Sequence, residues 1–192
     1  MSALPIFSPL DLKAASSANA IAIGYSKNSD GAFEFTSPLT AELEKFFGLN
    51  LVDELTFFSP AGKAGELFEI PVSATDAQTD RLYLVSVADQ TGAALRAAGA
   101  AIGKKVRGKK TTVYSVCAQK DVRAHAISMA LGAWVWNLKT DKKKEEPTLL
   151  IGSKDKNQVA EAASIAKAIC RARDLIHTPA NIKTPAWMGK QA

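Results

Sequence analysis

Residues 171–185 read Arg-Ala-Arg-Asp-Leu-Ile-His-Thr-Pro-Ala-Asn-Ile-Lys-Thr-Pro, and this stretch predicts where the folded domain ends. Upstream of it, apolar residues recur at helical spacing over residues 159–176, which predicts a helix of about five turns with one apolar stripe. Pro179 has no backbone N–H and disfavours the α conformation at Thr178. The helix should therefore end at or just before His177.

A second helix is expected to begin shortly afterwards. Thr184 is a typical N-cap residue, and Pro185 suits the first helical position because its missing N–H needs no partner there. Only seven residues follow Pro185 in the sequence, and so short a helix is marginal on its own. We therefore predict an N-terminal domain over residues 1–170, with residues 171–192 forming an interdomain linker and the truncated start of a catalytic domain.

Composition is that of a globular protein with a substantial core, because 47% of the 192 residues are hydrophobic and 22% are charged. Residues 1–20 lack the basic start and continuous apolar run of a secretory signal. No apolar run approaches the ~20 residues that a membrane helix needs. Cys117 and Cys170 both lie within apolar segments, which favours two buried free thiols over a disulfide. A cytoplasmic location without membrane contact is expected.

The pattern of apolar and polar residues predicts alternating strands and helices. Strands are expected at residues 20–25, 81–87, 111–117 and 147–151, with a hairpin over 55–73 that turns at 60–62. Helices are expected from Ser37-Pro38 to Gly48, after the Thr91 cap, from the Asp121 cap to Val135, and over residues 159–176. This order predicts a three-layer α/β fold, whose mixed, mostly parallel sheet carries helices on both faces.

Residues 171–185, which we call the joint, resemble the segment that connects the N-terminal and catalytic domains in the leucine aminopeptidase (cytosol aminopeptidase) family. In that family the sequence Arg-Asp-Leu-Val-Asn-Thr-Pro-Ala-Asn-x-x-Thr-Pro is usual. His177 replaces the common asparagine, whereas the Thr-Pro-Ala-Asn core and the later Thr-Pro are intact. Leu-Gly-Ala-Trp at 131–134 and Gly-Lys-Ala-Gly-Glu at 62–66 are similar to further family motifs. The resemblance covers about residues 60–192. It marks five residues as the interdomain joint: Arg173, Asp174, Thr178, Pro179 and Asn181.

The resemblance implies a macro-domain-like fold and a non-catalytic role in structure and oligomerisation. The parent enzyme would be a leucyl aminopeptidase that removes N-terminal residues from peptides and assembles as a hexamer. Two divalent metal ions, manganese or zinc, would be held by lysine, aspartate and glutamate in the catalytic domain, within motifs such as Asp-Thr-Asp-Ala-Glu-Gly-Arg. Nothing in this chain matches those motifs, so we assign no catalytic residue, metal ligand or cofactor to it and expect it to be inactive alone.

Direct inspection for catalytic motifs gives the same expectation. His125 and His177 are far apart in sequence, and the chain has no His-x-x-x-His, Cys-x-x-Cys, Gly-x-Ser-x-Gly or phosphate-binding glycine loop. We interpret His125 as a core or solvated histidine and His177 as a residue that interacts with a helix C-terminus. A macro-like fold alone does not establish ADP-ribose binding.

Basic residues offer an alternative function from another class. One cluster comprises Lys104, Lys105, Arg107, Lys109 and Lys110, and another comprises Lys139, Lys142, Lys143 and Lys144. Together they could neutralise phosphates in a nucleic-acid-binding module. The clusters are more typical of a helix C-terminus and a solvated loop, because no aromatic residues are interleaved with them. Trp134 fits the core, whereas Trp136 and Trp187 could contact the missing domain or a neighbouring subunit.

Overall fold

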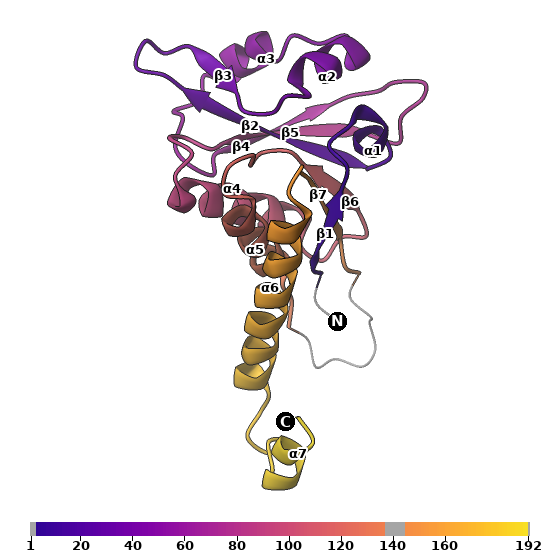
Figure 1. The fold of residues 1–192 in the computed structure, drawn as a ribbon, viewed down its shortest axis with the longest axis vertical. Helices are drawn as coiled ribbons and strands as arrows, with labels where there is room; N and C mark the ends of the chain where they lie inside the picture. Colours follow the sequence, from indigo (N-terminus) through magenta and orange to yellow (C-terminus); the bar gives the residue numbers. More distant parts are fainter. Residues whose placement is uncertain (1–2, 137–144, 192) are drawn as a thin grey trace.

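The computed structural model describes residues 3–136 and 145–191, which build a seven-stranded sheet between two layers of helices (Figure 1). The strand order is β1-β7-β6-β2-β5-β4, and β3 pairs with β2 beyond that path. The β1–β7, β7–β6, β6–β2 and β2–β5 pairs are parallel, while β4 and β3 pair antiparallel. The strands are β1 (Pro5–Ser8), β2 (Ala20–Lys27), β3 (Phe33–Phe35), β4 (Leu67–Pro71), β5 (Arg81–Ser86), β6 (Thr112–Ser115) and β7 (Thr148–Gly152).

Side chains of the central strands alternate between two apolar cores. In β2 and β5, Ile21 pairs with Leu82 and Ile23 with Leu84, and all four side chains enter one core. Their neighbours Ala22 and Tyr83 enter the core on the opposite face. A strand that is buried on both faces reads as a continuous apolar run, which is why β2 and β5 were predicted correctly.

Helices cover both faces of the sheet. One layer holds α1 (Leu12–Ser16), α2 (Thr40–Phe47) and α3 (Leu51–Phe58), and the other holds α4 (Gly92–Val106), α5 (Val122–Ala133) and α6 (Lys156–His177). Thr91, Asp121 and Asp155 each accept a hydrogen bond from the first turn of the helix that follows, as N-cap residues do. The predicted three-layer α/β fold with a mostly parallel sheet is confirmed.

Helices α4 and α5 pack unusually closely, through glycines. A Cβ atom at Gly99 or Gly103 would collide with backbone carbonyl oxygens of α5, those of His125 and Met129. A Cβ at Gly132 would lie 2.7 Å from the carbonyl oxygen of Ala100. The two helix backbones are in contact, so only glycine fits at these three positions.

Helix α6 begins on the domain and continues beyond it (Figure 1). Its first part buries Val159, Ala162, Ala166 and Cys170, whereas Ile176 near its end is 72% exposed. Beyond the end of α6 lies α7 (Pro185–Gly189), which is drawn at the far tip of the molecule in Figure 1. Helix α6 crosses residue 170 without a break, and the division into residues 1–170 and 171–192 stays a prediction. No helix in residues 3–136 and 145–191 is long and apolar enough to cross a membrane.

The hairpin predicted over residues 55–73 is wrong. Residues 51–58 form α3, because the Asn50 side chain accepts hydrogen bonds from the backbone N–H groups of Val52 and Asp53 and so caps a helix. Leu51 and Leu55, one turn apart, are then buried on the same face. Only β4 remains as a strand, and it pairs with β5 rather than with residues 55–60.

Three short elements were not predicted. Strand β1 begins at a proline and lies at the edge of the sheet beside β7, where a missing N–H is tolerated. Helix α1 and strand β3 are five and three residues long. Helix α2 also begins at Thr40, slightly later than the predicted Ser37-Pro38 start.

Candidate interdomain site

Histidine and cysteine side chains do not form a reactive centre in the part of the chain that the structure describes. His125 is 1% exposed, and its Nδ1–H donates to the Leu95 carbonyl oxygen at 3.2 Å. Since a carbonyl only accepts, Nε2 carries no proton and accepts from the Ser115 hydroxyl at 2.8 Å. Burial lowers the pKa of His125 to about 4, so this residue is neutral near pH 7. His125 is a core histidine.

Both cysteines are buried and neither forms a disulfide, as predicted. Burial raises the pKa of Cys117 to about 12, which keeps it protonated and unreactive. Across residues 3–136 and 145–191, no group of three or more histidine, cysteine, aspartate or glutamate side chains is placed to hold a metal ion.

The most strongly organised surface is the joint at the end of α6. The Trp134 indole Nε1–H donates to Asp174 Oδ1 at 3.0 Å, and the Arg173 guanidinium lies 5.4 Å from the centroid of the Trp134 ring. Arg173 also donates to the carbonyl oxygen of Leu131, at 3.1 Å. These contacts fix the end of α6 to the end of α5. They join the predicted joint residues Arg173 and Asp174 to the Leu-Gly-Ala-Trp motif.

Helix α6 stops where the sequence indicates. Thr178 has an extended ψ of 127°, and its backbone N–H and hydroxyl both donate to the Asp174 carbonyl oxygen, at 3.0 and 2.7 Å. His177 Nδ1–H donates to the carbonyl oxygen of Arg173 at 3.0 Å. The carbonyls of Arg173 and Asp174, near the end of α6, are therefore satisfied within the joint itself. Pro179 follows and prevents the helix from continuing.

A tight turn connects the two helices. The Pro179 carbonyl oxygen accepts from the backbone N–H groups of Ile182 and Lys183. Asn181 is exposed in this turn and makes no side-chain hydrogen bond with the described residues. Thr184 then caps α7 by accepting from the Trp187 N–H at 3.2 Å, as predicted. The interdomain role of the five joint residues stays a prediction.

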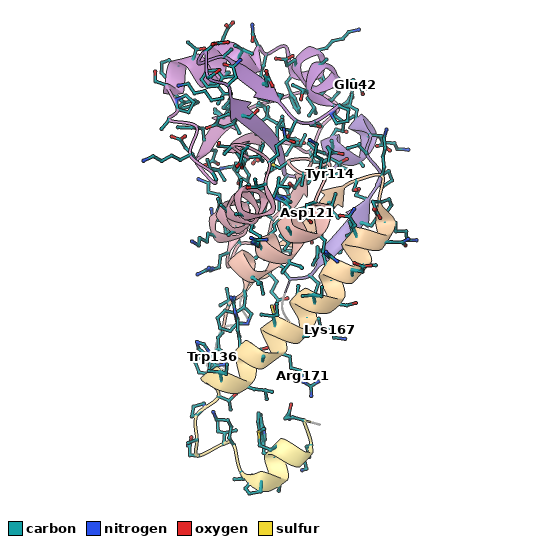
Figure 2. All side chains as sticks on the ribbon, turned by 60° about the vertical axis from the view of Figure 1, so that its left-hand side comes forward. Glu42, Tyr114, Asp121, Trp136, Lys167 and Arg171 are labelled. Atoms are coloured by element: carbon teal, nitrogen blue, oxygen red, sulfur yellow. The ribbon has the colours of Figure 1, made fainter. Side chains whose placement is uncertain are left out.

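Aromatic side chains surround a hollow next to the joint. The His177 ring lies 5.1 Å from that of Trp134 and 5.7 Å from that of Trp136, measured between centroids. The hollow has a volume of about 480 Å³ and is lined by Arg107, Gly108, Trp134, Val135, Trp136 and His177. Figure 2 shows Trp136 on one side of α6 near its end, with Arg171 on the other.

The placement of Trp134 in the core was wrong. Helix α5 ends at Ala133, and Trp134 takes an extended ψ of 134°, which turns its ring away from the buried stripe of α5. The ring is only half-buried and belongs to the joint. The sequence could have indicated this position, because Trp134 is the last residue of the Leu-Gly-Ala-Trp motif that resembles the aminopeptidase family.

The first basic cluster does not act as one surface. Lys105 forms an ion pair with Glu69 at 2.5 Å and lies over the Tyr83 ring. Arg107 donates from Nε to the Gly132 carbonyl oxygen at 2.8 Å, while Lys104 is exposed. Lys109 and Lys110 are also exposed. The second cluster, Lys139 and Lys142–Lys144, lies outside the described residues, and a nucleic-acid-binding face made from both clusters is unsupported.

Comparison with known proteins supports the family resemblance. The chain is 28% identical over 152 residues to a protein of Clostridium perfringens described as a probable cytosol aminopeptidase; this match covers 68% of the chain. No protein-family model matches the chain.

Solved structures share the fold. The bottromycin maturation enzyme BotP matches with a TM-score of 0.68 and 20% identity over 91% of the chain. A mutant of tomato leucine aminopeptidase matches with a TM-score of 0.66 and 16% identity over 98% of the chain. The cytosol aminopeptidase of Coxiella burnetii matches with a TM-score of 0.55 and 15% identity over 97%.

The chain is much shorter than these proteins. It spans 31% of the Clostridium perfringens protein, 36% of BotP and 41% of the tomato enzyme. The expected resemblance to the N-terminal domain of the leucine aminopeptidase family is therefore confirmed in sequence and in fold.

Proposed function

We propose that this chain is the non-catalytic N-terminal domain of a cytoplasmic, metal-dependent leucyl aminopeptidase. The observation that carries the proposal is the 152-residue similarity to a probable cytosol aminopeptidase, in a chain that spans 31% of that protein. An N-terminal domain of such an enzyme would not need to bind the metal ions itself, and no metal-binding group is found among the described residues. The parent enzyme would remove N-terminal residues from peptides.

The chemistry would belong to the remainder of the parent enzyme. Two divalent metal ions, manganese or zinc, would bind there to acidic side chains and a lysine and supply a metal-bound hydroxide for attack on the peptide carbonyl. One structural neighbour, BotP, has been solved in complex with manganese. The residues of the present chain would position the metal-bearing domain rather than bind the metals.

The joint would hold the metal-bearing domain in position. Trp134, Arg173 and Asp174 attach the end of α6 to the domain, and we propose that this attachment sets the position of the catalytic domain. Ile176, Ile182 and Met188 are exposed apolar side chains along α6 and the segment after it. We propose that they pack against the catalytic domain, and that the assembled enzyme is a hexamer.

Activity assays test this proposal. The purified chain is incubated with leucine p-nitroanilide and manganese, and the release of p-nitroaniline is followed. The proposal requires a rate equal to the protein-free blank. Metal-dependent turnover by this chain would contradict it. The reading frame beyond codon 192 should also encode acidic metal-binding motifs, and their absence from a continuing frame would remove the peptidase assignment.

A further inference from the structure

We propose that the ends of α4, α5 and α6 form a binding site for an acidic peptide segment that carries an apolar side chain next to its carboxylate. Arg107 and Arg173, with Lys104, would bind the carboxylate, and the hollow of Trp134, Trp136 and His177 would receive the apolar side chain. This inference does not depend on the peptidase assignment.

Two guanidinium groups are already held in place at this site. Arg107 Nε donates to the Gly132 carbonyl oxygen at 2.8 Å, and Arg173 donates to the Leu131 carbonyl oxygen at 3.1 Å. These neighbouring carbonyls are at the C-terminal end of α5, where carbonyl groups lack helical partners. Each guanidinium has five N–H groups, so most of its donors remain after that bond. Binding an anion would therefore require little further ordering of either side chain.

The positive charges surround a hollow that is lined by no acidic side chain from residues 3–136 or 145–191. Its volume is about 330 Å³, and its lining comprises Ala100, Lys104, Arg107, Ser128, Leu131, Gly132 and Arg173. Neither arginine forms an ion pair with any residue that the structure describes. The carboxylate of Asp174 in the joint does not line this hollow and accepts the hydrogen bond of Trp134. Three cations of like charge repel one another, and an added carboxylate would relieve that repulsion.

The aromatic hollow adjoins this cationic one. Arg107 lines both, so a ligand that contacts its guanidinium has aromatic surface beside it. Two indole rings and an imidazole bury large apolar area at small entropic cost, as is typical of peptide-binding surfaces. A carboxylate next to an apolar side chain matches this pair of hollows.

A peptide fits these observations better than a nucleic acid does. A phosphate backbone requires a row of cations along its path, with aromatic rings between them. Here Lys105 is already paired with Glu69, and Lys104, Arg107 and Arg173 line one hollow instead of forming a track. The site thus presents a single anion position flanked by one apolar position.

The test uses the indole N–H signals of the three tryptophans in a nitrogen-15 NMR spectrum. The chain is titrated with an acetylated and amidated Leu-Glu-Glu-Phe peptide and, separately, with Leu-Gln-Gln-Phe. The Trp134 and Trp136 signals should shift with the acidic peptide, while Trp187 in α7 serves as an internal reference. The glutamine peptide should bind at least about tenfold more weakly, because it lacks the charge-assisted hydrogen bonds.

Variants locate the site. Arg107→Gln should weaken binding about tenfold, and Lys104→Gln, which breaks no hydrogen bond among the described residues, should weaken it about threefold. Arg171→Gln, on the exposed side of α6, is the matched control and should bind like the wild type. Backbone spectra confirm that each variant is folded.

Three results would overturn the inference. They are equal binding of the two peptides, wild-type affinity in both Arg107→Gln and Lys104→Gln, and displacement of the acidic peptide by a lower concentration of a short oligothymidylate. The last result would identify the surface as one for nucleic acid.

Discussion

Replacing Gly103 by alanine should destabilise the domain severely, because α4 and α5 touch at this residue. The added Cβ would collide with the Met129 carbonyl oxygen and would lie 2.7 Å from the backbone nitrogen of Ala133. Both obstacles are backbone atoms within α5, so no side-chain rotation can relieve the overlap. The two helices would have to separate along a seam that buries Leu95, Ile102 and other core residues.

The expected change in the free energy of unfolding is the balance of two opposing contributions. Overpacking a core typically costs about 1–3 kcal/mol, and the contacts with backbone atoms place this substitution above that range, at about 4 kcal/mol. Alanine recovers ~1 kcal/mol through its higher helix propensity. The net loss in the free energy of unfolding should therefore be about 3 kcal/mol. For a chain of this size, that corresponds to a fall of roughly 6–12 °C in Tm.

Urea unfolding followed by circular dichroism measures this loss. Gly92→Ala is the matched control in the same helix, because its Cβ would meet only the ends of the Asp121 and Arg96 side chains, at 3.1 and 3.3 Å. Those ends can move, so the control should lie within about 0.5 kcal/mol of the wild type. A Gly103→Ala variant as stable as Gly92→Ala would refute the close packing of α4 on α5.

Three further predictions concern single groups. Because burial lowers the pKa of His125 to about 4, the unfolded chain, with a histidine pKa of ~6.5, takes up the proton first as the pH falls. Stability should thus drop by about 3 kcal/mol between pH 7 and pH 4 relative to a His125→Gln variant, as measured by urea unfolding at each pH. Trp134→Phe removes the hydrogen bond to Asp174 and should speed amide hydrogen exchange over residues 171–178 about fivefold or more, with little change in the sheet; unchanged exchange would exclude an anchoring role. Cys117, whose pKa burial raises to about 12, should not react with Ellman's reagent at pH 8 until the chain is unfolded, and prompt labelling of the native protein would contradict its burial.

The elements that the sequence predicts best are those with local signals. Thr91 and Asp121 cap their helices through bonds within the first turn, and Leu95, Ala98 and Ile102 form the expected buried stripe of α4. Capping and periodicity involve residues within a few positions of one another, so no knowledge of the remaining chain is needed.

Errors arose where distant contacts decide the structure or where a strand-like pattern outweighs a local helix cap. Strand β1 contains only four residues and depends on pairing with β7 near the other end of the domain. In residues 51–58, aromatic residues favour a strand by propensity, but the Asn50 cap and the burial of Leu51 and Leu55 select a helix. Pairing with a distant strand decides the first case, whereas a local cap and tertiary burial together decide the second.

The end of α6 and the start of α7 were predicted correctly from Thr178, Pro179 and Thr184, yet the hollows beside them could not be predicted. They depend on Arg107 reaching the end of α5 and on Trp134 turning out of the core, which the spacing of residues in the sequence does not encode. The expectation that aromatic residues are separate from the basic cluster holds for the sequence but not in space, since Arg107 lines the same hollow as Trp134 and Trp136.

One comparison tests the central claim most directly. The 192-residue chain and the complete product of its natural reading frame are assayed side by side with leucine p-nitroanilide and manganese, with and without a chelator. The account predicts chelator-sensitive turnover by the complete product and a blank rate for the 192-residue chain. Turnover by the 192-residue chain, or none by a folded complete product, would contradict it.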